Sequence, residues 1–190
     1  MTMVGLIRHG STEWNLQGRT QGALDTDLTE EGREQARQLG RRLKAEPWDF
    51  LISSDLRRAR ESAELISALS GIPLIRTDSR LREKSFGQLE GTTLQDRIGR
   101  WGPQWSDLDH GGETDEQVRD RWMAFSEDLF AEFPDSRILL VSHGGFIGRA
   151  LETMNLERAD EPLTNASLTL VKKGGQLWEC SLYNCTVHLK

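Results

Sequence analysis

Met3-Val4-Gly5-Leu6-Ile7 runs directly into Arg8-His9-Gly10-Ser11-Thr12 near the start of this chain. The mostly apolar first half predicts a short buried strand, which stops at two cationic side chains and a glycine. In open α/β sheets, ligands bind outside the carboxyl ends of the strands. Gly10 permits a tight turn and a close approach of the backbone. The stretch is therefore a candidate functional site, unless it is an ordinary strand that happens to end in polar residues.

Short apolar runs alternate with helical patterns along the rest of the chain. Strands are predicted at 3–7, 49–52, 72–75 and 138–141, and a hairpin is predicted from 167–171 and 177–182, which flank residues 173–176. Helices are predicted to begin at Thr29, after a cap at Ser54 or Asp55, at Thr114 and after Gly145. This order indicates an α/β fold, a three-layer helix–sheet–helix sandwich with a mostly parallel sheet and an antiparallel C-terminal component. With 190 residues and no internal repeat or linker, we expect a single domain over 1–190.

Three stretches carry turn residues in place of a regular pattern. Residues 13–22 are predicted to form a loop, and 81–91 contains too many turn residues for a regular element. Trp101 and Trp105 flank a Gly-Pro pair, which predicts either a lid or specificity loop or two rings packed on the core. Which residues of 92–113 line a pocket is left open.

Composition and charge limit the class of partner. Lys and Arg number 24 against 30 Asp and Glu, a net charge of −6, and the sequence pI is about 5.3. This balance argues against nucleic-acid binding, which needs a basic face, but local arginines can still attract a small anionic substrate. No apolar run approaches the roughly 18 residues of a membrane span, and no secretory signal is recognisable. We therefore expect a cytoplasmic protein that binds no membrane and keeps Cys180 and Cys185 as reduced thiols.

The chain twice ends a buried strand in a histidine and a glycine, at His9-Gly10 and at His143-Gly144. Between them, Arg58 follows a predicted strand at the start of a helix, and a glycine-rich loop carries Glu83. If these segments meet at one sheet edge, the site contains two histidines, at least two arginines and one carboxylate.

A phosphoryl group suits this set of side chains. Arginine offers a planar fork of donors matched to phosphate oxygens, and a neutral imidazole can attack phosphorus. Neighbouring guanidinium groups should lower the pKa of such a histidine and keep its ring neutral. A carboxylic acid can protonate the leaving alcohol and later accept a proton from water.

A metal centre is the main competing use of two histidines and a carboxylate. The chain has no His-x-x-x-His or Cys-x-x-Cys spacing, and arginines beside the ligands would oppose a bound cation. A serine triad is weaker still, because no Gly-x-Ser-x-Gly elbow occurs, and no Walker phosphate loop is present. We therefore predict neither a metal nor a cofactor.

Four motifs, in this order, resemble those of the histidine phosphatase superfamily, in the branch related to cofactor-dependent phosphoglycerate mutase. They are Leu6–Asn15, Ser53–Ala59, Leu81-x-Glu83 with Gly87-x-x-Glu90-Gly91, and Val141–Gly144, so the resemblance covers nearly the whole chain. Leu89 departs from the family pattern, in which many members carry tryptophan, and this affects local packing more than the chemistry.

The resemblance implies a histidine-phosphatase-like catalytic domain that needs no metal. The implied catalytic residues are His9 as nucleophile, Glu83 as acid/base, and Arg8, Arg58 and His143 as ligands of the phosphoryl group. The residues implied to complete the phosphate pocket are Asn15, Gln21, Gly22 and Gly144. Arg57 is expected at the surface, and His110 and His188, which match no catalytic motif, are expected at the surface or rim.

Family members pass the phosphoryl group either to water or within a sugar-acid substrate. The run from Glu83 to Thr114 is short for the enclosing segments of the mutases, so we expect hydrolysis of a small phosphorylated metabolite. The alternatives are a cofactor-dependent phosphoglycerate mutase and a catalytically silent module that binds phosphorylated ligands. The substrate stays open among phosphoglycerate, phosphoserine, a sugar phosphate, a nucleotide and α-ribazole phosphate, as does the oligomeric state. Candidate rim residues are Trp14, Arg19, Arg82, Trp101, Trp105 and His110.

Overall fold

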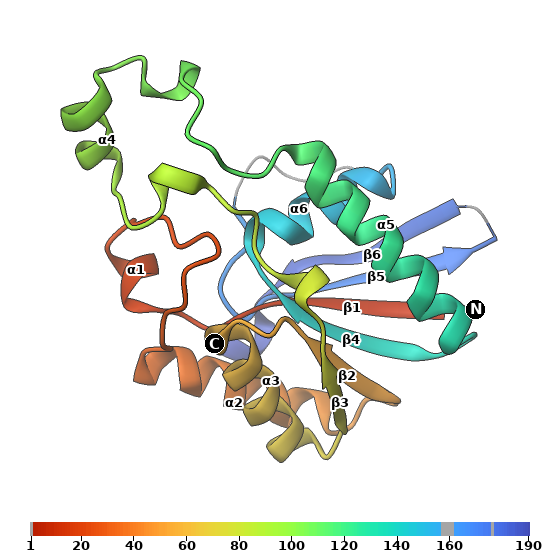
Figure 1. The fold of residues 1–190 in the computed structure, drawn as a ribbon. Coiled ribbons are helices and arrows are strands. Elements are labelled where there is room, and N and C mark those ends of the chain that lie inside the picture. The colour runs from red at the N-terminus through yellow and green to blue at the C-terminus, as the bar shows by residue number, and fades with distance from the viewer. Residues whose placement is uncertain (1, 157–161, 176) are drawn as a thin grey trace.

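A single mixed sheet forms the centre of the molecule in a computed structural model that describes residues 2–156, 162–175 and 177–190. Its strands are β1 (Thr2–Arg8), β2 (Phe50–Ser53), β3 (Leu74–Thr77), β4 (Arg137–Ser142), β5 (Leu168–Gly174) and β6 (Leu177–Cys185). Their order across the sheet is β3-β2-β4-β1-β5-β6 (Figure 1). The pairs from β3 to β1 are parallel, whereas β5 and β6 are antiparallel to their neighbours. The predicted fold class and C-terminal hairpin are thus confirmed, and Gln176 in the predicted turn lies outside the described residues.

Helices cover both faces of the sheet (Figure 1). The described helices are α1 (Glu13–Leu16), α2 (Glu30–Leu43), α3 (Arg57–Ser70), α4 (Leu94–Trp101), α5 (Asp115–Glu132) and α6 (Gly144–Thr153). Short 3₁₀ turns occupy Ser79–Leu81, Gly87–Leu89, Trp105–Asp107 and Val187–Leu189. Thr29 and Thr114 are the N-caps of α2 and α5, as predicted, because each hydroxyl accepts a backbone N–H from the first turn.

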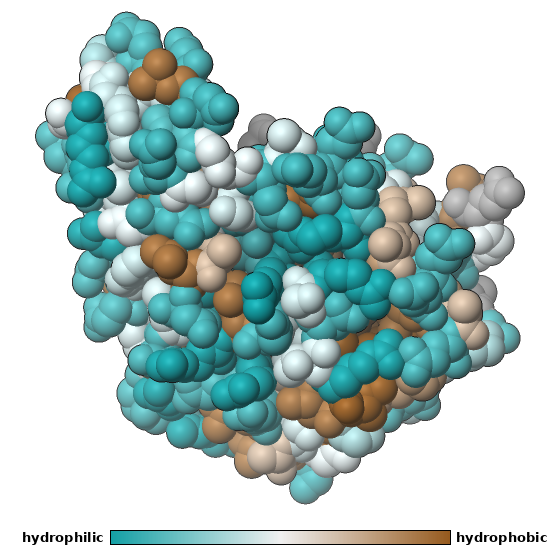
Figure 2. Space-filling view, in the orientation of Figure 1, coloured by the Kyte–Doolittle hydropathy of each residue, from teal (hydrophilic) through white to brown (hydrophobic). Residues whose placement is uncertain are grey.

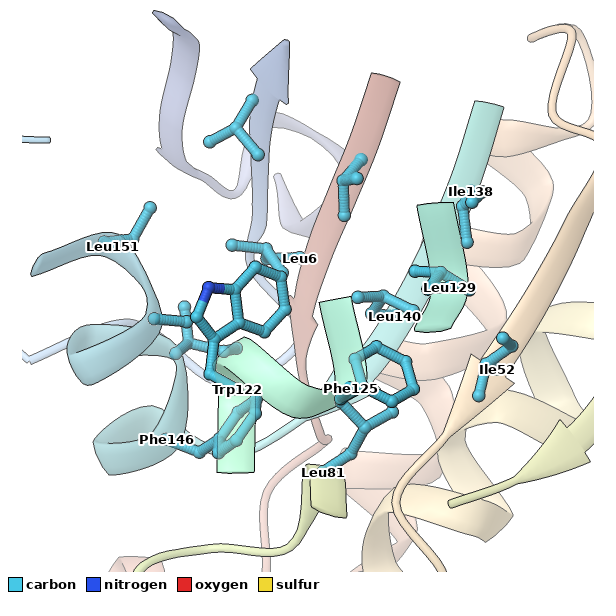
Figure 3. Close-up of a cluster of buried hydrophobic side chains, with 14 of the residues drawn as sticks. Leu6, Ile52, Leu81, Trp122, Phe125, Leu129, Ile138, Leu140, Phe146 and Leu151 are labelled. Carbon is cyan, nitrogen blue, oxygen red and sulfur yellow. The ribbon is translucent and has the colours of Figure 1, made fainter. Parts of the chain in front are cut away.

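Alternation along β4 divides the core into two layers. Ile138 and Leu140 pack with Trp122 of α5 and Phe146 of α6, and Figure 3 shows this cluster. Leu139 and Val141 point to the opposite face and join the apolar sides of α2 and α3. A strand buried on both faces needs a continuous apolar sequence, which explains why 138–141 stands out in the chain.

The parallel register places the functional motifs at one end of the sheet. Arg8 pairs with Ser142 across β1 and β4, and Ser53 pairs with Val141 across β2 and β4. His9, His143 and Ser54 therefore leave neighbouring strands at the same carboxyl edge, where an α/β sheet binds its ligands.

The α4 lobe, defined here as residues 86–112, projects from the body of the molecule (Figure 1). The face shown in Figure 2 is mainly hydrophilic, with hydrophobic residues scattered in small groups over the lobe and body. Among the described residues, the helices are all too short or too polar to span a bilayer.

Three local predictions are wrong. Residues 13–16 form α1 and not a loop, because Thr12 and Asn15 exchange side-chain and backbone hydrogen bonds in a capping box. The predicted strand 72–75 begins later, at Leu74, because Pro73 has no N–H for the ladder. Neither Ser54 nor Asp55 is the N-cap of α3; Leu56 takes that position, and the remote carboxylate of Asp25 accepts the Arg57 N–H at 2.7 Å.

Candidate active site

A cavity of about 510 Å³ opens at the carboxyl edge of the sheet. Eight of the nine predicted site residues line it: Arg8, His9, Asn15, Gln21, Gly22, Arg58, Glu83 and Gly144. They come from the end of β1, from α1 and the loop after it, from the first turns of α3 and α6, and from the loop after Ser79–Leu81. His143 is the exception, since it lies fully buried next to this lining.

His9 is oriented by its own loop. Its side chain is buried, and Nδ1 lies 2.7 Å from the carbonyl oxygen of Gly10. A carbonyl only accepts hydrogen bonds, so Nδ1 carries the proton and Nε2 keeps a free lone pair. Burial, followed by the charges of Arg58 and Arg8, holds the pKa of His9 well below its usual value. The ring is therefore neutral at physiological pH, as a nucleophile must be.

The loop after His9 is pressed against the start of α2. A Cβ added at Gly10 would lie 2.2 Å from the carbonyl oxygen of Gly32, and one added at Gly32 would lie 2.1 Å from the carbonyl oxygen of Ser11. The Gly10 N–H also donates to the buried hydroxyl of Ser62 at 3.0 Å. Two facing glycines thus allow backbone-to-backbone contact directly behind His9.

Two guanidinium groups flank His9, that of the fully buried Arg58 and that of the partly buried Arg8. Arg58 donates from Nη1 to the Leu24 carbonyl and from Nη2 to the Gly22 carbonyl, each at 2.8 Å. Burial lowers the pKa of Arg58 to about 10, so the group stays charged at neutral pH. Arg8 donates to the Leu163 carbonyl, and its pKa is likewise lowered by burial. Arg57, by contrast, is exposed and pairs with Asp27, as predicted for a surface residue.

Several buried nitrogen atoms beside His9 have no hydrogen-bond partner among the described residues. Among the described residues, four buried side-chain nitrogens make no hydrogen bond, and three of them are Arg8 Nε, Arg58 Nε and His143 Nδ1. Buried polar atoms normally have partners. Such a concentration indicates a site that receives hydrogen-bond acceptors from a ligand.

His143 lies beside His9, with 5.2 Å between the ring centroids. Its Nε2 is 2.9 Å from the hydroxyl oxygen of Ser54. Burial and the charge of Arg58 hold the pKa of His143 well below its usual value, so this ring is also neutral. Sequence reasoning did not single out Ser54 as its partner.

Glu83 sits at the N-terminus of α6. Its carboxylate accepts backbone N–H groups of Gly145 at 3.0 Å and of Phe146 and Lys84 at 2.8 Å. A helix N-terminus attracts a carboxylate, and here Glu83 supplies the contact that the N-cap residue of α6, His143, does not make. The same carboxylate lines the cavity that His9 faces.

The two predicted amide side chains are held by their oxygen atoms. Asn15 Oδ1 accepts from the backbone N–H of Thr12 at 3.2 Å and from Asn165 Nδ2 at 3.1 Å. Gln21 Oε1 accepts from the Thr12 hydroxyl at 3.0 Å. These bonds leave the amide nitrogens of both residues as donors for an oxygen-rich ligand.

Most of the predicted rim residues do not line the cavity. Arg19 lines the cavity, but Trp14, Arg82, Trp101, Trp105 and His110 do not. Trp101 and His110 make an edge-to-face contact with 4.8 Å between ring centroids, and the Arg97 guanidinium lies 4.8 Å from the centre of the Trp105 ring, all within the α4 lobe. His110 is only 9% exposed, so its predicted position at the surface or rim is wrong, whereas His188 is half-buried.

The outer wall of the cavity was not predicted. Phe86, Leu163 and Tyr183 line it, together with Gly148 and Pro162. Tyr183 comes from β6, whose distance from the motifs along the chain gives no local signal. Among the described residues there is also no cluster of three or more His, Cys, Asp or Glu side chains that could hold a metal ion.

Known proteins are similar to this chain in sequence and in fold. The sequence model of the histidine phosphatase superfamily (branch 1) matches residues 4–186. The chain is 33% identical over 192 residues to the uncharacterized phosphatase PhoE of Bacillus subtilis, covering 100% of this chain and 97% of the relative. It is 37% identical over 194 residues to the probable phosphoglycerate mutase GpmB of Escherichia coli O1:K1, covering 95% and 89%. The solved structure of a mycobacterial glucosyl-3-phosphoglycerate phosphatase with VO3 has a TM-score of 0.86 and 31% identity, covering 96% and 98%.

Proposed function

The chain belongs to the histidine phosphatase superfamily, and from this we propose that it hydrolyses small phosphomonoesters through a phosphohistidine intermediate in the cavity at the sheet edge. In this proposal residues 1–190 act as one catalytic domain, and no metal or cofactor takes part.

The orientation of His9 is the observation that carries the proposal. A neutral ring whose Nδ1 proton is donated to the Gly10 carbonyl presents Nε2 as the nucleophile, close to the charges of Arg58 and Arg8. In the first step Nε2 attacks phosphorus and the bond from phosphorus to the ester oxygen breaks. Glu83 gives its proton to the departing oxygen, which leaves as an alcohol.

The second step returns the enzyme to its starting state. Glu83, now a carboxylate, takes a proton from water, whose oxygen attacks the phosphorus of phosphohistidine. The bond between phosphorus and Nε2 breaks, and inorganic phosphate leaves. The three backbone N–H groups that contact Glu83 hold its carboxyl group at the edge of the cavity through both steps.

The remaining predicted residues stabilise the charge of the transferring group. Arg8, Arg58 and His143 offer the three unpartnered buried nitrogens described above. Asn15 and Gln21 add amide donors, and Gly22 and Gly144 let the group approach the backbone. Preorganised donors of this kind provide most of the catalysis of phosphoryl transfer.

Two relatives that are named phosphatases favour hydrolysis over mutase activity. The Bacillus subtilis relative is named a phosphatase, and the mycobacterial structure is that of a glucosyl-3-phosphoglycerate phosphatase. The Escherichia coli relative is named a probable phosphoglycerate mutase, so mutase activity is kept as the second candidate. Both activities would proceed through phosphorylated His9.

Phosphate release from an aryl phosphate, with chelator present, tests the proposal. We expect wild-type activity to survive the chelator, and His9→Ala to lose at least roughly 10³-fold. His110→Gln is the control, because His110 lies outside the cavity and glutamine can replace its contact with the Trp105 carbonyl. Glu83→Gln should accumulate acid-labile phosphohistidine with a good leaving group, since the water attack loses its base. Phosphoglycerate interconversion without phosphate release would instead support the mutase.

A further inference from the structure

Ser54 is a buried serine that the proposed mechanism does not use. It directly follows β2, is 0% exposed, and does not line the cavity. Its hydroxyl oxygen lies 2.9 Å from His143 Nε2 and 3.3 Å from the backbone nitrogen of Leu56. These two contacts determine where its single proton goes.

The Leu56 N–H is a donor, so it occupies a lone pair of the Ser54 oxygen. Within the described residues, His143 Nε2 is then the one acceptor within reach of the hydroxyl proton. The neighbouring Ser53 differs, because its hydroxyl donates to the backbone carbonyl of Ser54 at 2.9 Å. A proton donated to Nε2 requires a lone pair there, so the proton of the neutral ring must be on Nδ1.

The other protonation states of the His143 ring agree less well with its contacts. A proton on Nε2 would leave the buried Ser54 hydroxyl without an acceptor among the described residues and would expose a lone pair at Nδ1. An imidazolium ring is disfavoured because burial and Arg58 lower the pKa of His143. His143 Nδ1 has no partner in the part of the chain that the structure describes, so a proton there is available to a ligand.

We propose that Ser54 is a positioning residue that fixes His143 as the neutral tautomer protonated at Nδ1. His143 then gives an N–H donor to a phosphoryl oxygen without adding a third positive charge beside His9. Arg8 and Arg58 already supply two charges, which match a phosphomonoester dianion. The role assigned to this donor rests on the proposed function, whereas the tautomer itself follows from the contacts of Ser54.

The tautomer can be measured without turnover. Long-range ¹H–¹⁵N spectra of the histidine rings distinguish a protonated from a bare ring nitrogen. At pH 7 we expect wild-type His143 to be protonated at Nδ1 only, with Ser53→Ala unchanged and Ser54→Ala shifted toward the Nε2-protonated form. A wild-type ring protonated at Nε2, or at both nitrogens, would overturn the proposal even if the enzyme is an active phosphatase.

Kinetics supply the second readout. By analogy with the outer partners of metal-bound histidines, Ser54→Ala should lower kcat/KM for an aryl phosphate by about 10- to 100-fold and weaken inhibition by inorganic phosphate in parallel. Ser53→Ala, which removes a hydroxyl equally buried one residue away, should stay within about twofold. Equal losses in the two variants would refute the proposal, because they would reflect damage to the end of β2. An inactive wild type with Nδ1-protonated His143 would refute the hydrolase and leave the tautomer assignment standing.

Discussion

Gly32→Ala should damage both stability and catalysis, although alanine is the better helix former. Gly32 is in the first turn of α2, and its N–H donates to the Thr29 hydroxyl at 2.9 Å. An added Cβ would lie 2.1 Å from the carbonyl oxygen and 2.7 Å from the amide nitrogen of Ser11. These are backbone atoms of the loop that carries His9, so no flexible side chain can move aside.

The expected change in the free energy of unfolding of Gly32→Ala follows from two opposing contributions. Alanine favours a helix over glycine by about 1 kcal/mol. Forcing a methyl group into occupied space typically costs about 1–3 kcal/mol, and contact with backbone belongs at the upper end. The free energy of unfolding should therefore fall by roughly 1–2 kcal/mol, which should lower Tm by roughly 2–8 °C for a chain of this size. Displacement of the loop that carries His9 should also lower kcat/KM by at least about tenfold.

Thermal unfolding and aryl phosphate hydrolysis together check this prediction. Gly99→Ala is the matched control, since Gly99 lies in α4 and a Cβ there would meet no atom within 4 Å. The free energy of unfolding of that variant should rise by up to about 1 kcal/mol, and its activity should stay at the wild-type level. The reasoning fails if Gly32→Ala is as stable and as active as Gly99→Ala.

Two further variants and one pH series extend the test. Arg58→Lys should lower kcat/KM by about 10²-fold, because lysine keeps the charge but loses the fork on the Gly22 and Leu24 carbonyls, whereas Arg57→Ala should stay within about twofold. The free energy of unfolding should fall as pH drops from 6.5 to 5, since the lowered pKa values of His9 and His143 let the unfolded chain bind more protons than the native one. Denaturant titrations at both pH values measure this, and a double variant with glutamine at both positions should show a smaller fall; an identical fall in that variant would contradict the assignment.

Local sequence patterns predicted several elements whose causes are local, although the capping box of Thr12 and Asn15 at α1 was missed. The apolar run of β4 and the threonine caps of α2 and α5 lie where the sequence placed them. The cap of α3 could not be predicted in this way, because Asp25 reaches it from a remote loop. The burial of His110 likewise depends on Trp101 in a different part of the α4 lobe.

The site shows the same division between local and tertiary causes. Motif order was enough to identify residues that share one cavity, since parallel strands bring their ends together. It did not reveal the contact of Ser54 with His143, which requires β2 and β4 to be neighbours. Nor could it place Leu163 and Tyr183 on the cavity wall, because that depends on how the C-terminal strands join the sheet.

The central position of β4 also constrains the order in which the molecule can assemble during synthesis. β1 and β2 are not neighbours; each is bonded to β4, which lies between them. Until residues 137–142 have left the ribosome, the strand that leads to His9 and the strand that leads to Arg58 share no partner and keep exposed edges. Such edges are prone to aggregation, so the nascent chain is a natural client for chaperones up to that point. Phosphate binding should therefore appear late and abruptly in a series of ribosome-bound chains of increasing length.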